Sequence, residues 1–484
     1  MKTILQKSSL FILSVILAAS ILPARVCASF EICGVCQVQT DTGAVGAVKF
    51  LDYGYVNNTY LSLRDLAMLL MDTDKAFSVE ISNSAVSLSP GGAYTPVGTE
   101  NVSWESEENP DLSLRRNEFE VDGQKVFYHT MIMKMPSGDY DCFMMTMDLA
   151  MLFDMDIASS GTGSLLINTQ EAFRVFPDVL EQAGYFYGVN GVFLGDAVTG
   201  EVYYQYQADV PYPIASTSKL MTCLLTMEAV ASGQIAPEDS VTVSDAVELL
   251  ASSSDGVIPL KAGDQITVQE LLTGLLLPSS NECALCLAET IDGSEEAFVQ
   301  RMNRRAQELG LSQAVFFNSH GLPSYSGDSI SAKRQNRMSA EDMFRLAAYL
   351  LEVYPQVTDI TSMKEAKLAS LDLEVRNSNP LLYNMPGVTG LKTGTTNRAG
   401  ACLVTSLSAD DGTMQHDLIV VVLGTEDSME RGRVSGLLAR YALQAFYGAG
   451  EADGVGTAGQ DGTAQELPVH AEAAVGRIIR GVVR

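Results

Sequence analysis

A serine followed three residues later by a lysine offers the clearest nucleophile in this sequence. Ser216 and Lys219 lie in the stretch Pro211-Tyr-Pro-Ile-Ala-Ser-Thr-Ser-Lys-Leu-Met-Thr222, and apolar residues continue beyond them at helical spacing. Residues i and i+3 of a helix are neighbours, so the serine hydroxyl and the lysine amine can touch. A serine hydroxyl needs a base that removes its proton, and lysine can be that base when burial or a nearby cation lowers its pKa. The same spacing also fits a surface helix with a serine cap and a solvated lysine.

Two further short motifs follow in the chain. Ser279-Ser280-Asn281 precedes an apolar, helix-like stretch, and Lys392-Thr393-Gly394 precedes two strand-like segments. Taken singly, the first can cap a helix and the second can open a strand. Ser-x-x-Lys, Ser-Asp-Asn and Lys-Thr-Gly in this order are the motifs of penicillin-binding proteins and class A β-lactamases, and here Ser280 replaces the central Asp. The three motifs together predict an enzyme that is acylated on serine.

The residues around these motifs carry a closer resemblance. The segments concerned are Ala215–Thr222, Asn318-Ser-His-Gly-Leu322, Asn379–Leu382 and Pro386–Gly394. They resemble the low-molecular-mass D-alanyl-D-alanine carboxypeptidases of the peptidase S11 type, over about residues 180–448. The resemblance implies an α+β, β-lactamase/transpeptidase-like domain in which an antiparallel sheet packs against a helical cluster. It also implies that peptidoglycan stem peptides ending in D-Ala-D-Ala are the substrates and that β-lactams are inhibitors.

The chemistry and the resemblance together suggest four catalytic residues. Ser216 attacks the penultimate D-Ala carbonyl, and Lys219 takes its proton. Ser279 and Lys392 pass a proton to the leaving amine. A cationic Lys392 near Lys219 also favours the neutral form of the Lys219 amine.

The predicted substrate contacts surround these groups. Asn281 hydrogen-bonds the substrate peptide, and the resemblance places the backbone N–H groups of Ser216 and Thr395 in an oxyanion hole. An arginine and Thr393 receive the terminal carboxylate, and the spacing leaves Arg433 as a rival to Arg431 for this position. The predicted substrate-binding residues are Asn281, Thr393, Gly394, Thr395 and Arg431. His320, outside the three motifs, is expected to shape the fold.

Composition limits the other possibilities. A chain of 484 residues predicts two to four domains, and a net charge of −28 argues against nucleic-acid binding. No Cys and His residues show the spacing of a zinc finger, so neither a metal nor a cofactor is predicted.

Both ends of the chain suggest export. A basic start, an apolar run over Leu10–Leu22 and small residues before position 28 predict a signal peptide at 1–28, with an uncleaved anchor as the alternative. Residues 449–484 read as a flexible tail, in which Val475–Arg484 has the pattern of a basic helix on an anionic membrane surface. A frayed end fits this stretch equally well. We therefore expect an extracytoplasmic protein of the cell wall or the outer face of the membrane.

An internal repeat occupies the N-terminal part. Tyr60–Leu70 is echoed by Phe143–Phe153, and both contain Asp-Leu-Ala-Met-Leu. This predicts two small α/β modules, at 29–95 and 96–172, with an accessory role. They resemble copper amine oxidase N-terminal-like modules, but His129 is the only histidine in this half, so no copper site is predicted.

Two other functions compete with the carboxypeptidase. A class A β-lactamase uses a glutamate-activated water from a Glu-x-x-Leu-Asn-like loop, and no such run lies between Asn281 and Lys392. A non-catalytic wall-binding protein could carry a vestigial set of motifs, yet all the reactive side chains are present.

Overall fold

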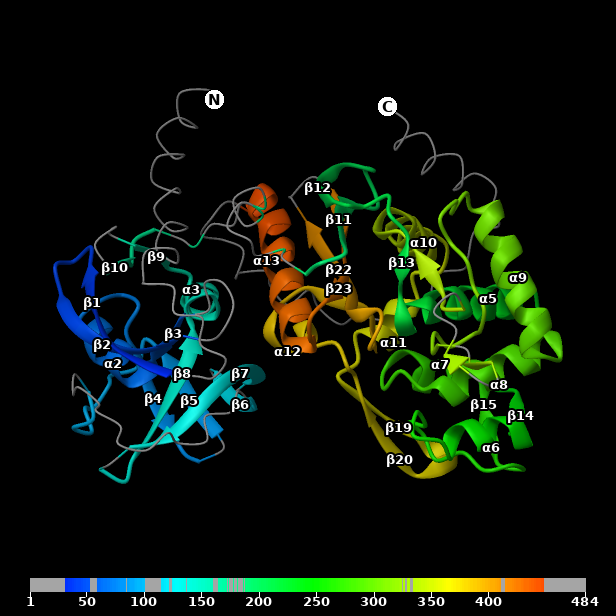
Figure 1. The fold of residues 1–484 in the computed structure, drawn as a ribbon, viewed down its shortest axis with the longest axis horizontal. Coiled ribbons are helices and arrows are strands. Elements are labelled where there is room, and N and C mark those ends of the chain that lie inside the picture. The colour runs from blue at the N-terminus through cyan, green and yellow to red at the C-terminus, as the bar shows by residue number, and fades with distance from the viewer. Residues whose placement is uncertain are drawn as a thin grey trace. The chain divides into compact units, whose positions relative to one another are not determined.

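The chain divides into two compact units, residues 1–187 and residues 188–484 (Figure 1). The computed structural model describes residues 31–52, 59–83, 85–100, 115–121, 124–135, 137–159, 164–171, 173, 177, 181, 186, 188–323, 325–326, 329–330, 334–410 and 414–447. The predicted signal peptide and the predicted tail with its membrane-binding end lie outside these residues. Among the described helices, none combines the length and the apolar character needed to cross a membrane.

The first unit is built on a ten-stranded sheet with the order β4-β5-β6-β7-β8-β3-β2-β1-β10-β9. The elements of the first sequence copy are β1 (Glu31–Thr40), β2 (Val45–Asp52), β3 (Thr59–Ser62), α2 (Leu63–Leu70), β4 (Phe77–Ile81) and β5 (Ala85–Pro90). Those of the second copy are β6 (Arg115–Val121), β7 (Gln124–Lys134), β8 (Tyr140–Met145), α3 (Thr146–Phe153), β9 (Asp156–Ser159) and β10 (Leu165–Asn168).

The two copies are interlocked in this sheet. Each runs as three strands, a helix and two strands, and β3 of one copy pairs with β8 of the other at the centre. The last hairpin of each copy then joins the first strand of the other, because β5 pairs in parallel with β6 and β10 in parallel with β1. The boundary at 95/96 therefore divides the sequence repeats but not the sheet.

A buried ionic cluster holds α2 against the sheet of the first unit. The Lys49 amine lies 2.7 Å from an Asp65 oxygen and 3.7 Å from an Asp141 oxygen, and it donates to the Thr99 carbonyl at 2.9 Å. Ser62 caps α2 by accepting the Asp65 N–H at 3.1 Å. Burial raises the pKa of Asp141 to about 6 despite the nearby lysine. Each partner compensates a charge that would otherwise be buried alone.

The second unit contains a five-stranded antiparallel sheet with the order β12-β11-β23-β22-β21. Its strands are β11 (Gly191–Asp196), β12 (Val202–Tyr206), β21 (Val388–Thr396), β22 (Gly400–Asp410) and β23 (Gln415–Thr425). The other described strands of this unit form short pairs: β13 (Tyr212–Pro213) with β18 (Arg337–Met338), β14 (Ser240–Thr242) with β15 (Gln265–Thr267), β16 (Tyr325–Ser326) with β17 (Ser329–Ile330), and β19 (Glu365–Leu368) with β20 (Leu373–Arg376).

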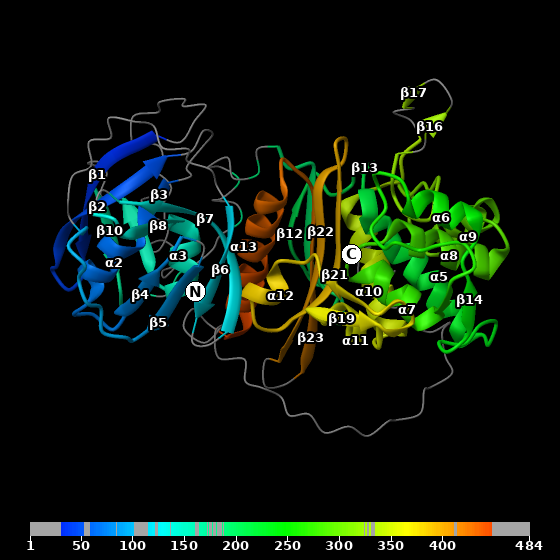
Figure 2. The same cartoon turned by 90° about the horizontal axis from the view of Figure 1, so that it is seen from below.

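Helices cover both faces of this sheet. They are the short turns η1 (Ala215–Ser218) and η2 (Ala369–Leu371) and the helices α5 (Lys219–Ala231), α6 (Asp245–Ala251), α7 (Val268–Leu276), α8 (Asn281–Asp292), α9 (Glu295–Glu308), α10 (Ala340–Val353), α11 (Val357–Thr361), α12 (Leu381–Asn384) and α13 (Ser428–Tyr447). Figure 2 shows α13 and the short α12 on one side of the sheet and α10 with α5, α7, α8 and α9 on the other. The expectation of an α+β domain with an antiparallel sheet and a helical cluster is confirmed.

Helix α5 lies at the centre of the helical cluster. All its residues from Lys219 to Met227 are buried, and they join one continuous apolar core with α7, α8 and α10. The sequence spacing had suggested one apolar face, whereas the helix is enclosed on nearly every side. Lys219 is therefore a core residue, and the alternative of a surface helix with a solvated lysine is wrong.

Candidate active site

Ser216 is displayed by a tight turn. Ser216 lies in η1, immediately before α5, rather than at the start of the α-helix itself. Two neighbouring hydroxyls are bound to the turn's own backbone: Thr217 Oγ1 donates to the Ile214 carbonyl at 2.6 Å, and Ser218 Oγ to the Ala215 carbonyl at 2.8 Å. The Ser216 hydroxyl instead lies beside Lys219 and is partly exposed. Of the three consecutive hydroxyls, it is the one placed to react.

The Lys219 amine contacts this hydroxyl and two carbonyl oxygens. Its Nζ lies 2.9 Å from Ser216 Oγ, 2.8 Å from Asn281 Oδ1 and 2.7 Å from the His320 carbonyl oxygen. Burial lowers the pKa of Lys219 to about 7, against opposing contributions from the Glu282 carboxylate and Cys283. A neutral amine has two N–H donors for the two carbonyl oxygens and one lone pair for the serine O–H. Burial, rather than the charge of Lys392, is the leading cause of this shift.

The Ser-x-Asn motif lies at the start of α8. Ser280 caps the helix by accepting the Cys283 N–H at 3.0 Å, and Asn281 follows as its first residue. The Asn281 amide donates to the Asp255 carbonyl at 2.8 Å, so its oxygen is turned towards Lys219. Asn281 thus orients the base, and its contact with the substrate stays a prediction.

Ser279 adopts a backbone conformation that is unusual for a side-chain-bearing residue. Its φ is +69°, in the left-handed region, where non-glycine residues carry strain and cluster at functional sites. Among the described residues, no hydrogen bond joins its hydroxyl to Lys219 or Lys392. Its role as a proton relay therefore stays a prediction.

Strand β21 carries the Lys-Thr-Gly motif past the serine turn. A Cβ on Gly394 would come within 2.8 Å of the Ser216 nitrogen and 2.9 Å of the Thr217 nitrogen, so only glycine allows the strand to pass so closely. Lys392 is buried, and its Nζ donates to the Thr393 carbonyl at 3.0 Å. Burial lowers the pKa of Lys392 well below its usual range, and the charges of Lys219 and Arg431 lower it further.

The arginine of α13 that reaches this strand is Arg431. Its Nη1 donates to the Gly394 carbonyl at 3.1 Å and to Thr395 Oγ1 at 2.8 Å. The rival Arg433 instead pairs with Glu430 within the same helix, with Nε donating at 3.0 Å. The structure therefore brings Arg431, and not Arg433, to the Lys-Thr-Gly strand.

Comparison with known proteins agrees with this geometry. Residues 190–427 match the family model of the D-alanyl-D-alanine carboxypeptidases, peptidase S11.

This region belongs to the peptidase S11 family.

The chain is 37% identical over 236 residues to the D-alanyl-D-alanine carboxypeptidase DacF of Bacillus subtilis (strain 168), covering 48% of this chain and 56% of that protein. It is 33% identical over 257 residues to DacC of Escherichia coli (strain K12), covering 52% of this chain and 60% of that protein. A crystal structure of a peptidoglycan synthesis regulatory factor (PBP3) from Streptococcus pneumoniae is 32% identical, with a TM-score of 0.48, and covers 53% of this chain and 74% of that one. The chain thus spans less than two thirds of the curated relatives it matches.

Sequence reasoning missed one functional element of the S11 domain, the loop Asn318–Leu322. The backbone carbonyl of His320 is the third group around the Lys219 amine, so this residue does more than shape the fold. The His320 ring accepts the Leu322 N–H at Nδ1, and burial with the nearby Lys219 lowers its pKa to about 3. The Asn-Ser-His-Gly-Leu pattern drew attention to this loop. The contact of its His320 carbonyl with Lys219 could not be predicted, because every residue type has a backbone carbonyl.

Within the ranges that the structure describes, no group of three or more His, Cys, Asp or Glu side chains is arranged to hold a metal ion.

Proposed function

We propose that this protein is a serine D,D-carboxypeptidase that removes the terminal D-Ala from peptidoglycan stem peptides and takes part in peptidoglycan biosynthesis. One observation carries the proposal: a buried lysine, with its pKa lowered to about 7, lies 2.9 Å from the hydroxyl of a partly exposed serine. The membership of residues 190–427 in the S11 family supports the choice of substrate.

Acylation begins with the transfer of the Ser216 proton to the Lys219 amine. As the proton leaves, Oγ forms a bond to the penultimate D-Ala carbonyl carbon, and the carbonyl electron pair moves onto its oxygen. We assign the backbone N–H groups of Ser216 and Thr395 as donors to that oxygen. When the intermediate collapses, the C–N bond breaks and the amine of the terminal D-Ala takes the proton that Lys219 gained, passed by way of Ser279 and Lys392. The D-Ala then leaves, and Lys219 is neutral again.

The carboxylate of the terminal D-Ala has a cationic partner in this proposal. The Arg431 guanidinium is buried beside Gly394 and Thr395, and the Thr393 hydroxyl lies on the same strand. Arginine binds carboxylates through paired N–H donors, so this end of the site selects peptides with a free C-terminus. Water then attacks the acyl carbon while Lys219 takes its proton. The ester bond to Ser216 Oγ breaks as Lys219 returns that proton to Oγ, so the shortened peptide leaves and Ser216 is restored.

Penicillins acylate the same serine in this account. A penicillin keeps its leaving amine tethered after the ring opens, which crowds the approach of water, whereas a peptide loses its D-Ala and leaves that space free. Because the class A glutamate motif is absent between Asn281 and Lys392, the penicilloyl ester should persist. This distinguishes the proposed carboxypeptidase from a serine β-lactamase.

The proposal also covers the location of the protein and the role of its first unit. We propose that the protein is exported and works in the cell wall or at the outer face of the cytoplasmic membrane, since its substrate lies there. The interlocked sheet of the first unit then acts as an accessory or spacer element, because every proposed catalytic residue belongs to the second unit.

The test is D-Ala release from diacetyl-Lys-D-Ala-D-Ala, repeated after titration with penicillin. We expect catalytic release that stops at close to one penicillin per protein. Rapid turnover of penicillin without D-Ala release would identify a β-lactamase, and the absence of both reactions would favour a non-catalytic wall-binding protein.

A further inference from the structure

The orientation of the Lys219 amine depends on two carbonyl oxygens, and one of them belongs to a loop. The Asn281 side chain is fixed from behind by the Asp255 carbonyl. The His320 carbonyl is a backbone group, so its position depends on the backbone of the loop Asn318–Leu322. The contacts that fix this loop therefore also set the direction of the lone pair on the Lys219 amine.

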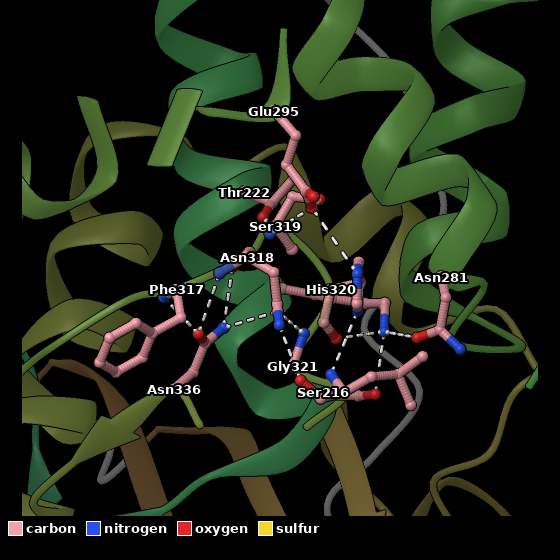
Figure 3. Close-up of polar contacts among 12 residues, drawn as sticks. Ser216, Thr222, Asn281, Glu295, Phe317, Asn318, Ser319, His320, Gly321 and Asn336 are labelled. Atoms are coloured by element: carbon pink, nitrogen blue, oxygen red, sulfur yellow. Dashed lines mark hydrogen bonds and ion pairs between the residues drawn. The ribbon is translucent and has the colours of Figure 1, made fainter. Parts of the chain in front are cut away.

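Glu295 is the anchor on the side of α9. It is the first residue of that helix, and its Oε1 accepts both the Ser319 N–H at 2.9 Å and the Ser319 hydroxyl at 2.7 Å. The same oxygen lies 3.6 Å from His320 Nε2, the ring atom that carries the proton, because Nδ1 accepts the Leu322 N–H. Figure 3 shows Glu295 joined by dashed lines to Ser319 and His320, with Ser216 and Asn281 beyond the loop.

The opposite side of the same peptide is held by the catalytic helix itself. Thr222, one turn after Lys219 on α5, donates its hydroxyl to the Ser319 carbonyl at 2.6 Å. Ser319 is fully buried, and all three of its polar groups are bound, two by Glu295 and one by Thr222. The His320 carbonyl therefore follows a peptide that is clamped between α9 and α5.

We propose that Glu295, which lies outside the three catalytic motifs, is a positioning residue for proton transfer from Ser216 to Lys219. It acts through the Ser319 and His320 peptide, and the inference rests on the proposed function. A weakened anchor lets the His320 carbonyl move, which leaves one N–H of the neutral amine without a fixed acceptor. The lone pair then no longer faces the serine O–H, and acylation slows.

A second glutamate separates this role from ordinary helix stabilisation. Acidic residues in the first turn of a helix are favourable because they face its positive end. Glu296 is in the same turn of α9 but is exposed and lies outside the contacts described above. Glu296→Ala removes the same charge from the same helix end and leaves the loop anchored, so it is the matched control for Glu295→Ala.

The experiment measures the saturating rate of acylation by a fluorescent penicillin and the concentration that gives half of it. The full chain is compared with E295A, E295Q, E296A and S319A. Because a displacement of about 1 Å at a reacting group costs roughly 100-fold, we expect E295A to lower the saturating rate about 30-fold or more, with half-saturation within about 3-fold. E295Q keeps the acceptor oxygen and should stay within about 5-fold, and E296A within about 2-fold, of the unsubstituted chain.

The Ser319 variant gives an independent measure of the same contact. S319A removes the hydroxyl donor but keeps the N–H, so we expect a loss of about 3- to 10-fold. In the double variant E295A/S319A, the loss of rate should be smaller than the product of the two single losses, because both substitutions remove the same contact between Glu295 and Ser319.

Equal rates in E295A and E296A, or an E295Q as slow as E295A, would overturn the positioning role. If E295A does not fold, S319A decides, and an unchanged S319A rate overturns the inference. If the unsubstituted chain is acylated by penicillin while E295A and E296A have equal rates, the positioning role fails but the proposed function stands. An unsubstituted chain that neither reacts with penicillin nor releases D-Ala refutes the proposed function and this inference with it.

Discussion

Acylation of Ser216 should fall steeply as the solution is acidified, because the Lys219 amine must be neutral to accept the serine proton. Its pKa of about 7 means that about half of the amine is neutral at pH 7 and about 1% at pH 5. A lysine with its ordinary pKa near 10.4 would be neutral in only about 0.04% of molecules at pH 7. Burial in α5 therefore increases the population of the active base roughly a thousandfold at neutral pH.

The assay is the rate of fluorescent penicillin acylation between pH 5 and pH 9, measured by rapid mixing. We expect a rise of about tenfold per pH unit up to a midpoint near 7, followed by a plateau. His320 cannot produce this limb, because burial and Lys219 lower its pKa to about 3. Thermal unfolding at each pH is the control for loss of the folded state. A rate that still rises about tenfold per unit up to pH 9, or a rate independent of pH over this range, would refute the assignment of Lys219 as the base.

Two further predictions concern substrate binding and the domain boundary. Arg431→Ala should lower kcat/KM for D-Ala-D-Ala peptides about 30- to 150-fold, since a charged hydrogen bond contributes about 2 to 3 kcal/mol, whereas Arg433→Ala should lower it no more than about 5-fold. Equal losses in the two variants would remove Arg431 from the carboxylate site. A truncated chain starting at Gly188 should release D-Ala from a soluble peptide at the rate of the full chain, and a folded but inactive truncated chain would show that the first unit helps to build the site.

The three proposed catalytic motifs could be selected from the sequence because the chemistry proposed for them resides in side chains. A serine and a lysine three residues apart must be neighbours on a helical turn, and the close passage of β21 explains why glycine follows Lys392 and Thr393. The antiparallel sheet was also predictable, since the strands at both ends of the S11 domain are apolar and bounded by turn residues.

Other features depend on contacts that residue types do not encode. The third partner of Lys219 is the His320 backbone carbonyl, and Glu295 acts through the Ser319 peptide. The helical spacing of apolar residues in α5 suggested a single apolar face, whereas every residue from Lys219 to Met227 is buried. The residue type of Lys219 does not show whether the lysine is buried or solvated. In the first unit, the sequence repeat indicated two similar copies. It gave no sign that β5 pairs in parallel with β6, because these segments lie about 30 residues apart and no local pattern marks their pairing.

The central claim is that Ser216 is the nucleophile, and the mass of the penicillin-treated protein tests it most directly. After incubation with penicillin, the intact chain should gain the mass of one penicilloyl group, and peptide mapping should place that group on Ser216. Ser216→Ala should gain no mass while its thermal unfolding stays close to that of the unsubstituted chain, because only one partly exposed hydroxyl is lost. A penicilloyl group on another serine, or an equal mass gain in Ser216→Ala, would contradict the account.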